Sequence, residues 1–267
     1  MSNETRATDR RESIASIEKA SAMLDIFASS EEEAFSIAEL SRRLGWTKQT
    51  TGRFVRTLEA LDWLERRGPK RRPEFRLGLG LLALAGAVQA TRSLRAEAHD
   101  AIHELSRATG HTTYLLLRRG SSAVCVDRVR AENIAVMHFG VGDSHPLTRG
   151  GAGPAILAAQ PPLEQTRVLD ELGVSDEDRA TWHRRAAEIE ARGYNLSHRD
   201  VVAGISSMGV ALRGPSGHAP AGISLATVSE RLSGPNTEHI AELLLNTAQG
   251  LSDRLGALGF LDESSDI

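Results

Sequence analysis

Apolar side chains recur every three or four residues along the first sixty positions, which is the spacing of helices that bury one face. This pattern predicts one helix within residues 13–28, a second over 36–44 and a third from 48 to about 61. Residues 1–12 are polar and lack this period, so we expect a flexible tail there. The N-terminal part of the chain is therefore predicted to be a small helical domain.

Polar residues at the ends of these helices predict where each begins and stops. Ser36 begins the second helix, Glu39 completes a capping-box pattern with it, and Gly45 ends the helix. Thr47 then caps the third helix. Residues 63–77 contain two short strand-like pieces joined by a Gly-Pro turn and a basic loop, which predicts a β-hairpin.

The hydrophobic pattern changes after the hairpin. The pattern predicts a short apolar helix over residues 78–92, which we expect to link the small helical domain over 13–77 to a second domain over 93–267. In the second domain, three strand-like runs in series, the last over 133–140, precede several helices, further strands and a closing amphipathic helix. This order predicts an α+β fold with a mostly antiparallel sheet.

Charge is unevenly distributed along a chain whose formal net charge is only −3. Between residues 42 and 76, eleven Lys and Arg side chains stand against four Asp and Glu, whereas residues 78–267 carry more acids than bases. A basic patch on a mildly acidic body indicates nucleic-acid binding better than net charge does. A basic helix that is merely solvated is the alternative at this point.

The composition favours a cytoplasmic protein without membrane contact. The most apolar segment has about a dozen residues, short of the roughly 20 that a membrane-spanning helix needs. The N-terminus lacks the apolar core of a signal peptide, and the single cysteine, Cys125, cannot form an intramolecular disulfide. We expect no cofactor.

The third predicted helix separates an apolar side from a basic one. At 100° per residue, the apolar side holds Thr51, Phe54, Val55, Leu58 and Leu61. Arg, Gln and Lys on the other side are the residue types that pair with guanine, adenine and phosphate, and a glycine there would let the helix approach DNA closely. A short helix, a glycine turn, a basic helix and a basic hairpin follow the order of a winged helix-turn-helix. The residues predicted to contact DNA are Thr47, Lys48, Gln49, Thr50, Gly52, Arg53, Arg56, Arg66, Arg67, Lys70, Arg71 and Arg72.

Five motifs, in this order, resemble the IclR family of bacterial transcriptional regulators over more than 200 residues. "IAELSRRLGWTKQTTGRFVRTLEALDWLER" is similar to the family's helix-turn-helix, and "FRLGLGLLALA" to its linker motif. "PLTRGGAGPAILAA", "EARGYNLSHRDVVAGISSMGVAL" and "PAGISLATVSERL" are similar to motifs of its effector domain. The resemblance implies a winged helix-turn-helix, a linker helix and a C-terminal GAF-like effector-binding domain. It also implies operator DNA, a small organic acid effector, and homodimers through the apolar helix that pair into homotetramers.

The resemblance places the effector pocket at the glycine-rich motif and the last strands. Gly151 and Ala152 would offer backbone amides to a carboxylate. Where family members that bind small keto or hydroxy acids have an acid, a cysteine and two serines, this chain has Ser197, Ser207, Ser224 and Ala226. The loss of polar groups predicts a larger effector, such as an aromatic acid. Met137, Phe139 and Met208 are candidate apolar lining, and Arg149 or His198 would add charge.

Three other patterns indicate different chemistry. "RGGAGPAILA" suggests a phosphate loop but lacks the GK[ST] ending of one. "GISSMG" around Ser206 nearly matches the G-x-S-x-G of hydrolases, and His198 is close in sequence, so a small-molecule hydrolase is the alternative function. His99 and His103 share a helix face and could ligate a metal, although no HExxH pattern accompanies them. The prediction remains a regulator and not an enzyme.

Overall fold

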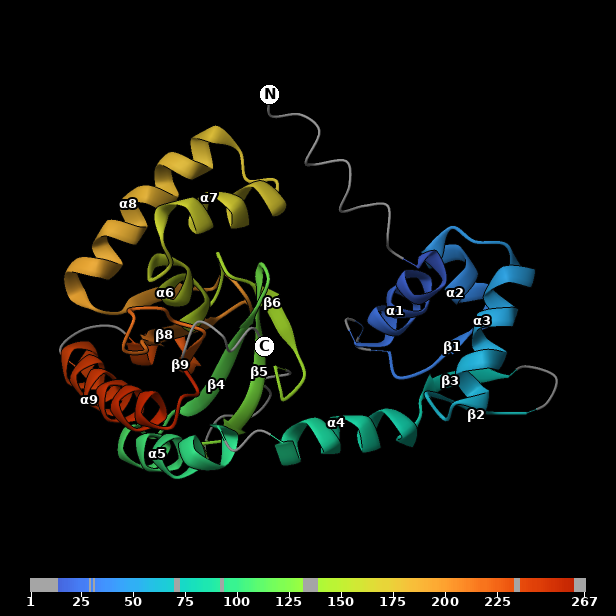
Figure 1. The fold of residues 1–267 in the computed structure, drawn as a ribbon, viewed down its shortest axis with the longest axis horizontal. Coiled ribbons are helices and arrows are strands. Elements are labelled where there is room, and N and C mark those ends of the chain that lie inside the picture. Colours follow the sequence, from blue (N-terminus) through green and yellow to red (C-terminus); the bar gives the residue numbers. More distant parts are fainter. Residues whose placement is uncertain are drawn as a thin grey trace. The chain divides into compact units, whose positions relative to one another are not determined.

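The protein was analysed as a computed structural model, which describes residues 14–28, 30, 32–69, 73–91, 94–131, 139–232 and 236–261. The chain separates into two compact units, residues 1–92 and 93–267, each with its own hydrophobic core (Figure 1). Several predictions fall outside the described residues: the tail over 1–12, most of the strand over 133–140, and the contacts Lys70, Arg71, Arg72 and Met137.

The first unit combines helices with a small antiparallel sheet of order β1-β3-β2. Its elements are α1 (Ala15–Ala28), β1 (Phe35–Ser36), α2 (Ile37–Leu44), α3 (Lys48–Ala60), β2 (Leu64–Arg67), β3 (Glu74–Leu77) and α4 (Leu79–Thr91). Strands β2 and β3 form the predicted hairpin. Strand β1 escapes prediction because two residues are too few to show an alternating pattern.

The polar residues at the helix ends act as predicted. Ser36 Oγ accepts a hydrogen bond from the Glu39 amide at 3.3 Å, and the Glu39 carboxylate accepts one from the Ser36 amide at 2.8 Å. Hydrogen bonds from the Ser36 side chain and backbone favour the charged carboxylate, so they hold the pKa of Glu39 below its usual value. Gly45 ends α2 in the left-handed region at φ +68°, and Thr47 caps α3 by accepting from the Thr50 amide. These caps fix the sharp turn between α2 and α3.

One apolar core joins the helices and the sheet of this unit. Its buried members are Met23, Phe27, Phe35, Leu40, Val55, Leu58, Leu64 and Phe75. Thr51, Val55 and Leu58 are buried as predicted, but Leu61 is 52% exposed. The helix ends at Ala60, so the helical period that predicted a buried Leu61 no longer applies there.

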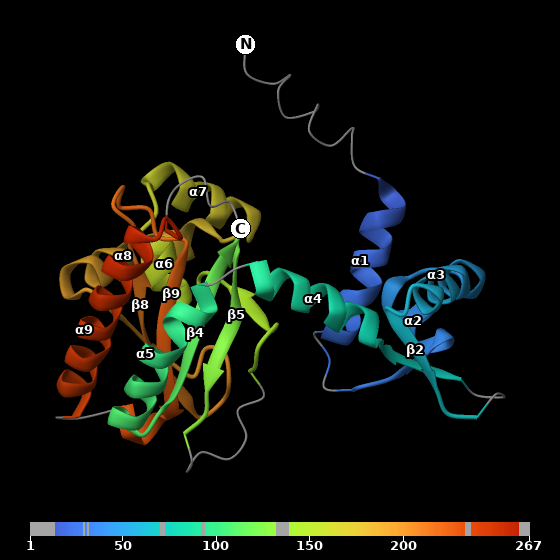
Figure 2. The ribbon, with the colours of Figure 1, turned by 60° about the horizontal axis from the view of Figure 1, so that its bottom comes forward.

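The second unit is, within the residues described, a six-stranded antiparallel sheet with helices on both faces. Its elements are α5 (Leu94–Thr109), β4 (Thr112–Arg119), β5 (Ser122–Val129), β6 (Ser144–Pro146), α6 (Ala152–Ala158), α7 (Pro162–Glu171), α8 (Asp176–Arg192), β7 (Asn195–His198), β8 (Ile205–Leu212), β9 (Ala221–Val228), η2 (Ser229–Leu232) and α9 (Asn236–Ala257). The strand order is β6-β5-β4-β9-β8-β7. Helices α5 and α9 lie side by side on one face, and α6 covers the other (Figures 1 and 2). The predicted α+β class and antiparallel sheet are confirmed.

Alternate strand residues point into two different cores. Met208 and Leu225 pack toward α5 and α9, whereas Tyr114 and Ala226 pack toward α6. The expectation that Met208 lines a pocket beside the glycine-rich motif is therefore wrong, because that motif lies on the α6 side. Cys125 is buried in the α6-side core, and this burial raises the pKa of its thiol to about 12.

The turn that begins α6 lies directly against the backbone of β8. A Cβ atom added to Gly209 would lie 2.2 Å from the carbonyl carbon of Gly151 and 2.3 Å from the amide nitrogen of Ala152. A Cβ atom on Gly151 would meet the carbonyl oxygen of Met208 at 2.9 Å. All three distances are shorter than van der Waals contact, so these glycines allow the turn and the sheet to pack backbone to backbone.

Gly209→Ala is expected to lower the free energy of unfolding of the second unit by about 1–3 kcal/mol, because backbone atoms must move to accommodate the methyl group. Gly250→Ala is the matched control, since an added Cβ on this exposed α9 residue meets no heavy atom within 4 Å. It should stabilise the helix by up to about 1 kcal/mol. Urea unfolding followed by circular dichroism measures both, and equal shifts in one direction would contradict the close-contact argument.

Candidate functional site

The exposed side of α3 and its cap carries five of the twelve residues predicted to contact DNA. Those exposed here are Thr47, Lys48, Gln49, Arg53 and Arg56. Thr47 and Thr50 hydrogen-bond to each other across the helix cap. In the part of the chain that the structure describes, no hydrogen bond or ion pair engages the other four side chains. Cationic and amide groups without internal partners are available to phosphates and base edges.

Gly52 does not belong to this exposed side. The residue is buried, and an added Cβ would lie 3.5 Å from Nη1 of Arg56 and 3.9 Å from Cδ1 of Ile37 on α2. The prediction that Gly52 faces DNA is wrong, because α2 packs over this part of α3. A helical wheel cannot show which part of a polar side a neighbouring helix covers. Gly52 therefore serves the packing of α2 against α3.

The hairpin arginines have different surroundings. Arg66 donates two hydrogen bonds to the Glu59 carboxylate, at 3.0 and 3.2 Å, and its guanidinium lies 5.4 Å from the centre of the Phe75 ring. The hydrogen bond to Glu59 raises the pKa of Arg66. Arg67 approaches Glu33 only to 3.8 Å and is exposed. Arg66 thus fastens the hairpin to the end of α3, which leaves Arg67 better able to reach a phosphate.

A cavity of about 40 Å³ lies on the α6 side of the sheet in the second unit. Its lining consists of Tyr114, Leu116, Phe139, His145, Gly150, Gly151, Asp200, Val201, Val202, Ile205, Ser207, Ser224 and Ala226. The sequence predicted Phe139, Gly151, Ser207, Ser224 and Ala226 among them. Within the described chain, the hydroxyls of Ser207 and Ser224 make no hydrogen bond, so both can serve a ligand.

Four other residues predicted for the pocket do not line the cavity. Ala152 is buried inside α6, and Arg149 is exposed outside the lining. Ser197 stands behind the cavity, where its hydroxyl donates to Asp200. His198 follows Ser197 on β7 and therefore points to the opposite face of the sheet.

Nothing in the sequence indicated Tyr114 or Asp200 as pocket residues, whereas His145 was a candidate to orient a ligand there, beside His138 and His198. Tyr114 lies opposite Ser224 in the β4–β9 pair, so the strand register would have identified it. His145 lies on the short edge strand β6, and Asp200 lies in a turn after β7. No periodic pattern predicts where such short segments come together.

Aromatic rings border one side of the cavity. The Phe139 ring centre lies 5.7 Å from that of Tyr114, at an edge-to-face angle, and 5.3 Å from that of His145. His145 Nδ1 is 3.1 Å from the carbonyl oxygen of Pro146, which can only accept, so Nδ1 carries the proton. Burial lowers the pKa of His145 and keeps the ring neutral near neutral pH. Nε2 is therefore a hydrogen-bond acceptor, and it borders the turn at Gly150.

A carboxylate of the chain itself occupies the polar end of the cavity. Each oxygen of Asp200 lies 3.2 Å from the amide nitrogen of Gly150, and one also accepts from the Ser197 hydroxyl. Arg185 Nη2 is 3.7 Å from the same carboxylate. The prediction that this pocket lacks an acid is wrong, because Asp200 supplies one three residues after the expected position.

Asn195 holds the glycine turn beside this carboxylate. Its Nδ2 donates to the carbonyl oxygens of Gly150 and Gly151, at 2.8 and 2.9 Å. Its Oδ1 accepts from Arg185 Nε at 3.0 Å, and Arg185 also donates to the carbonyl oxygen of Thr148. This buried network fixes both the turn and the guanidinium relative to the sheet.

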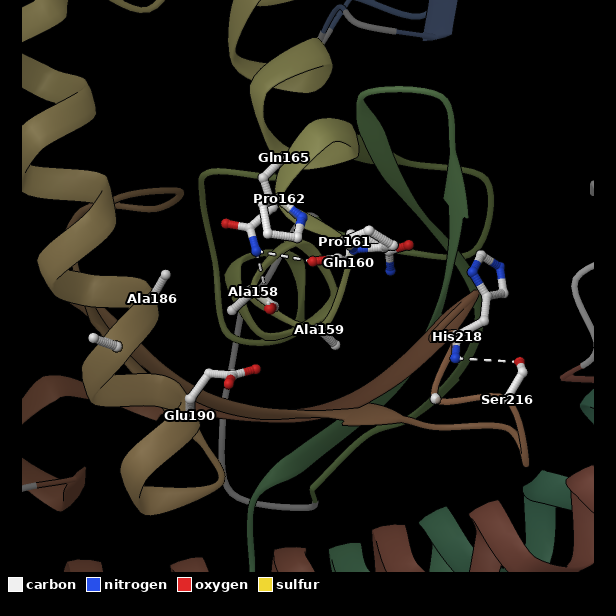
Figure 3. Close-up of a pocket in the computed structure, with 12 residues that line it drawn as sticks. Ala158, Ala159, Gln160, Pro161, Pro162, Gln165, Ala186, Glu190, Ser216 and His218 are labelled. Carbon is white, nitrogen blue, oxygen red and sulfur yellow. Dashed lines mark hydrogen bonds between the residues drawn. The ribbon is translucent and has the colours of Figure 1, made fainter.

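A larger hollow of about 490 Å³ lies near the end of α6, away from the glycine turn (Figure 3). Gln160 Nε2 donates to the carbonyl oxygens of Ile156 and Ala219, and Gln165 Nε2 donates to those of Ala158 and Gln160. These amides are occupied by the protein itself, so the hollow offers a ligand less than the smaller cavity does, despite its size.

The alternative chemistry predicted from the sequence finds little support in the geometry. Ser206 is fully buried and donates its hydroxyl proton to Ser229, while His198 Nδ1 lies 3.1 Å from Ser206 Oγ. A nucleophile needs access to substrate, which Ser206 lacks. His99 pairs with the buried Asp127 at 2.7 Å. The residues described contain no cluster of three metal-ligating side chains and no helix long and apolar enough to cross a membrane.

Both units match models of one protein family. Residues 16–68 match the IclR helix-turn-helix domain, and residues 86–253 match the C-terminal domain of the bacterial transcriptional regulator IclR. A winged helix-turn-helix followed by an effector domain defines a DNA-binding transcriptional regulator. The chain belongs to the IclR family of such regulators.

Individual relatives agree with this assignment. An HTH-type transcriptional regulator of Mycobacterium tuberculosis is 30% identical over 214 residues, which cover 78% of this chain and 81% of the relative. An IclR transcriptional regulator from Alicyclobacillus acidocaldarius has a TM-score of 0.75 and 24% identity, covering 90% of this chain and 98% of its own. An IclR homologue from Microbacterium hydrocarbonoxydans, complexed with 4-hydroxybenzoate, has a TM-score of 0.72 and 21% identity, covering 90% and 99%.

Proposed function

We propose that α3 enters the major groove of operator DNA and that the α6-side cavity takes an aromatic or otherwise partly apolar carboxylate, which changes operator affinity. The observation that carries the DNA part is the row of exposed side chains without internal partners, Lys48, Gln49, Arg53 and Arg56. Arg67 on the hairpin would contact a phosphate. We place the protein in the cytoplasm, where operator DNA is.

Arg53→Ala is expected to cost about 1–3 kcal/mol of operator binding and to relax base preference at one position, because arginine pairs with guanine. Arg67→Ala should weaken binding to all sequences about equally and lower the salt slope by about 1. Fluorescence anisotropy with duplexes from the protein's own upstream region, over a salt series, measures both. Arg254→Ala, an exposed arginine of α9, is the control. Absence of wild-type binding at low salt would refute the DNA part.

Helix α4 supports the proposal of a homodimer, which would pair into a tetramer. Leu79, Leu82 and Leu84 are 73%, 68% and 50% exposed in the single chain. Adjacent exposed leucines on one helix are typical of a surface that a partner covers. A second copy of this chain fits a two-fold operator, since the two half-sites then match the two-fold symmetry of the protein.

Replacing Leu82 and Leu84 with Glu should shift the protein toward monomer and weaken operator binding, because each half-site is then bound alone. Sedimentation velocity at micromolar concentration measures the assembly, and the anisotropy titration measures its effect on DNA. Leu163→Glu, at an 85% exposed leucine of α7, is the matched control and should leave both unchanged. A wild-type chain that sediments as a monomer would exclude the dimer.

The lining of the cavity supports a ligand with an aromatic ring. Phe139 and Tyr114 offer ring faces and edges, Ser207 and Ser224 offer hydroxyls, and the neutral His145 offers an acceptor for a ligand hydroxyl. The complex of the Microbacterium homologue with 4-hydroxybenzoate supports the same ligand class, although 21% identity shows only a shared fold. Compounds such as 4-hydroxybenzoate are therefore the first to test.

Ser224→Ala is expected to lower the affinity for such a ligand about ten-fold or more, since a lost hydrogen bond to a buried ligand costs roughly 1–3 kcal/mol. Calorimetry with 4-hydroxybenzoate, benzoate, glyoxylate and pyruvate measures it. Ser216→Ala, on an exposed loop, is the control and should bind as wild type does. Binding of glyoxylate but of neither aromatic acid would contradict the ligand class, and an unchanged Ser224→Ala affinity would contradict the placement of the pocket.

A further inference from the structure

The groups around Asp200 are those that recognise a free carboxylate. A backbone amide at Gly150, a hydroxyl at Ser197 and a guanidinium at Arg185 converge on its two oxygens. Charge-assisted hydrogen bonds of this kind are stronger than neutral ones and select an anion. Partial burial of Arg185 lowers its pKa, because it disfavours the charged guanidinium. A carboxylate beside it stabilises the charged form.

The segment that carries Asp200 forms part of the lining of the cavity. Residues 199–204 lie between β7 and β8 outside any helix or strand, and Asp200, Val201 and Val202 all line the cavity. Arg199 at φ +59° and Gly204 at φ +79° bound the segment with left-handed backbone. For a non-glycine residue such as Arg199 this conformation costs of order 1–3 kcal/mol and needs support from its surroundings. Hydrogen bonds from the Arg199 amide to the carbonyl oxygen of Ile205 and from the Ser229 amide to that of Gly204 support its ends, and the contacts of Asp200 support its middle.

The cavity as it stands is too small for the proposed ligand. The space open to the centre of a water molecule is about 40 Å³, which is room for roughly three waters, since one water needs about 10–15 Å³ of such space. An aromatic acid is several times larger, so part of the lining must move when it binds. The lining outside helices and strands consists of Phe139, the glycine turn at Gly150 and Gly151, and residues 200–202. Residues 200–202 are the part of it that carries the carboxylate at the polar end of the cavity.

We propose that Gly150, Ser197 and Arg185 form the carboxylate-binding subsite of the effector pocket and that Asp200 occupies this subsite until an effector carboxylate replaces it. Two carboxylates repel each other at such short range, so the exchange is exclusive. When Asp200 leaves, the middle of the segment loses its contacts with Gly150 and Ser197, and the cavity opens toward the aromatic lining. Hydrogen bonds of Arg199 and Gly204 with β8 and Ser229 still hold the two ends of the segment. This inference rests on the proposed effector pocket and names how the acid group of the ligand is bound there.

Asp200→Ala removes the internal competitor and empties the subsite. Benzoate should then bind about ten-fold or more tightly than to wild type, because the competent state no longer has to be populated first. Acetate at tens of millimolar should raise the melting temperature of Asp200→Ala by refilling the subsite, and leave that of wild type unchanged. Asp143→Ala is the matched control, since it removes a carboxylate that also lies near Tyr114 but hydrogen-bonds the Gly140 amide rather than the subsite. Its benzoate affinity and acetate response should stay close to wild type.

Adding Ser197→Ala to Asp200→Ala should abolish the acetate response, because one of the three subsite groups is lost. The inference is overturned if benzoate binds Asp200→Ala more weakly than wild type, which would make Asp200 a ligand contact. It is also overturned if acetate stabilises no variant, or stabilises Asp143→Ala equally. If the alanine variant does not fold, Asp200→Asn replaces it in these measurements. This variant removes the negative charge but keeps an acceptor for the Gly150 amide. Acetate stabilisation involves neither DNA nor the natural effector, so its failure is separate from failure of operator binding.

Discussion

The contact between the glycine turn and β8 is the constraint on which the second unit depends. Gly209 and Gly151 let two stretches of backbone meet with no side chain between them. Only at that distance can Asn195 reach the carbonyl oxygens of Gly150 and Gly151, and Asn195 in turn orients Arg185. The Gly150 amide and the Arg185 guanidinium, which both face Asp200, thus take their positions from a contact that requires glycine.

Much of the first unit could be predicted because its determinants are local. Ser36, Glu39, Gly45 and Thr47 act within four residues of their own position, so the sequence shows the caps and the turn directly. The antiparallel sheet of the second unit could be predicted for the same reason, because its strands appear in the sequence as short strand-like runs separated by turns. Leu61 marks the limit of such reasoning, because a period of 3.6 residues does not say at which residue a helix stops.

The candidate sites depended on distant pairs, and there the sequence was less informative. Gly52 on α3 lies against Ile37 of the neighbouring helix α2, and Arg66 on β2 pairs with Glu59 on α3. Asp200 reaches Gly150 from fifty residues away. Family motifs indicated the strand residues Ser207, Ser224 and Ala226, but not the acid in the turn that follows β7. Side chains from irregular segments are placed by the tertiary fold and have no periodic signature.

The burial of Cys125 gives the protein a built-in reporter. It is the chain's single cysteine, and it packs in the same core as Tyr114 and Ala226, which line the cavity. Thiol reagents attack the thiolate, and a thiol whose pKa is about 12 is almost wholly protonated in the folded state. Alkylation therefore proceeds through transient opening of the second unit. The measured rate of alkylation reports how often the unit opens. A small molecule that holds the unit closed would slow this chemistry, which allows ligands to be screened before any operator is known.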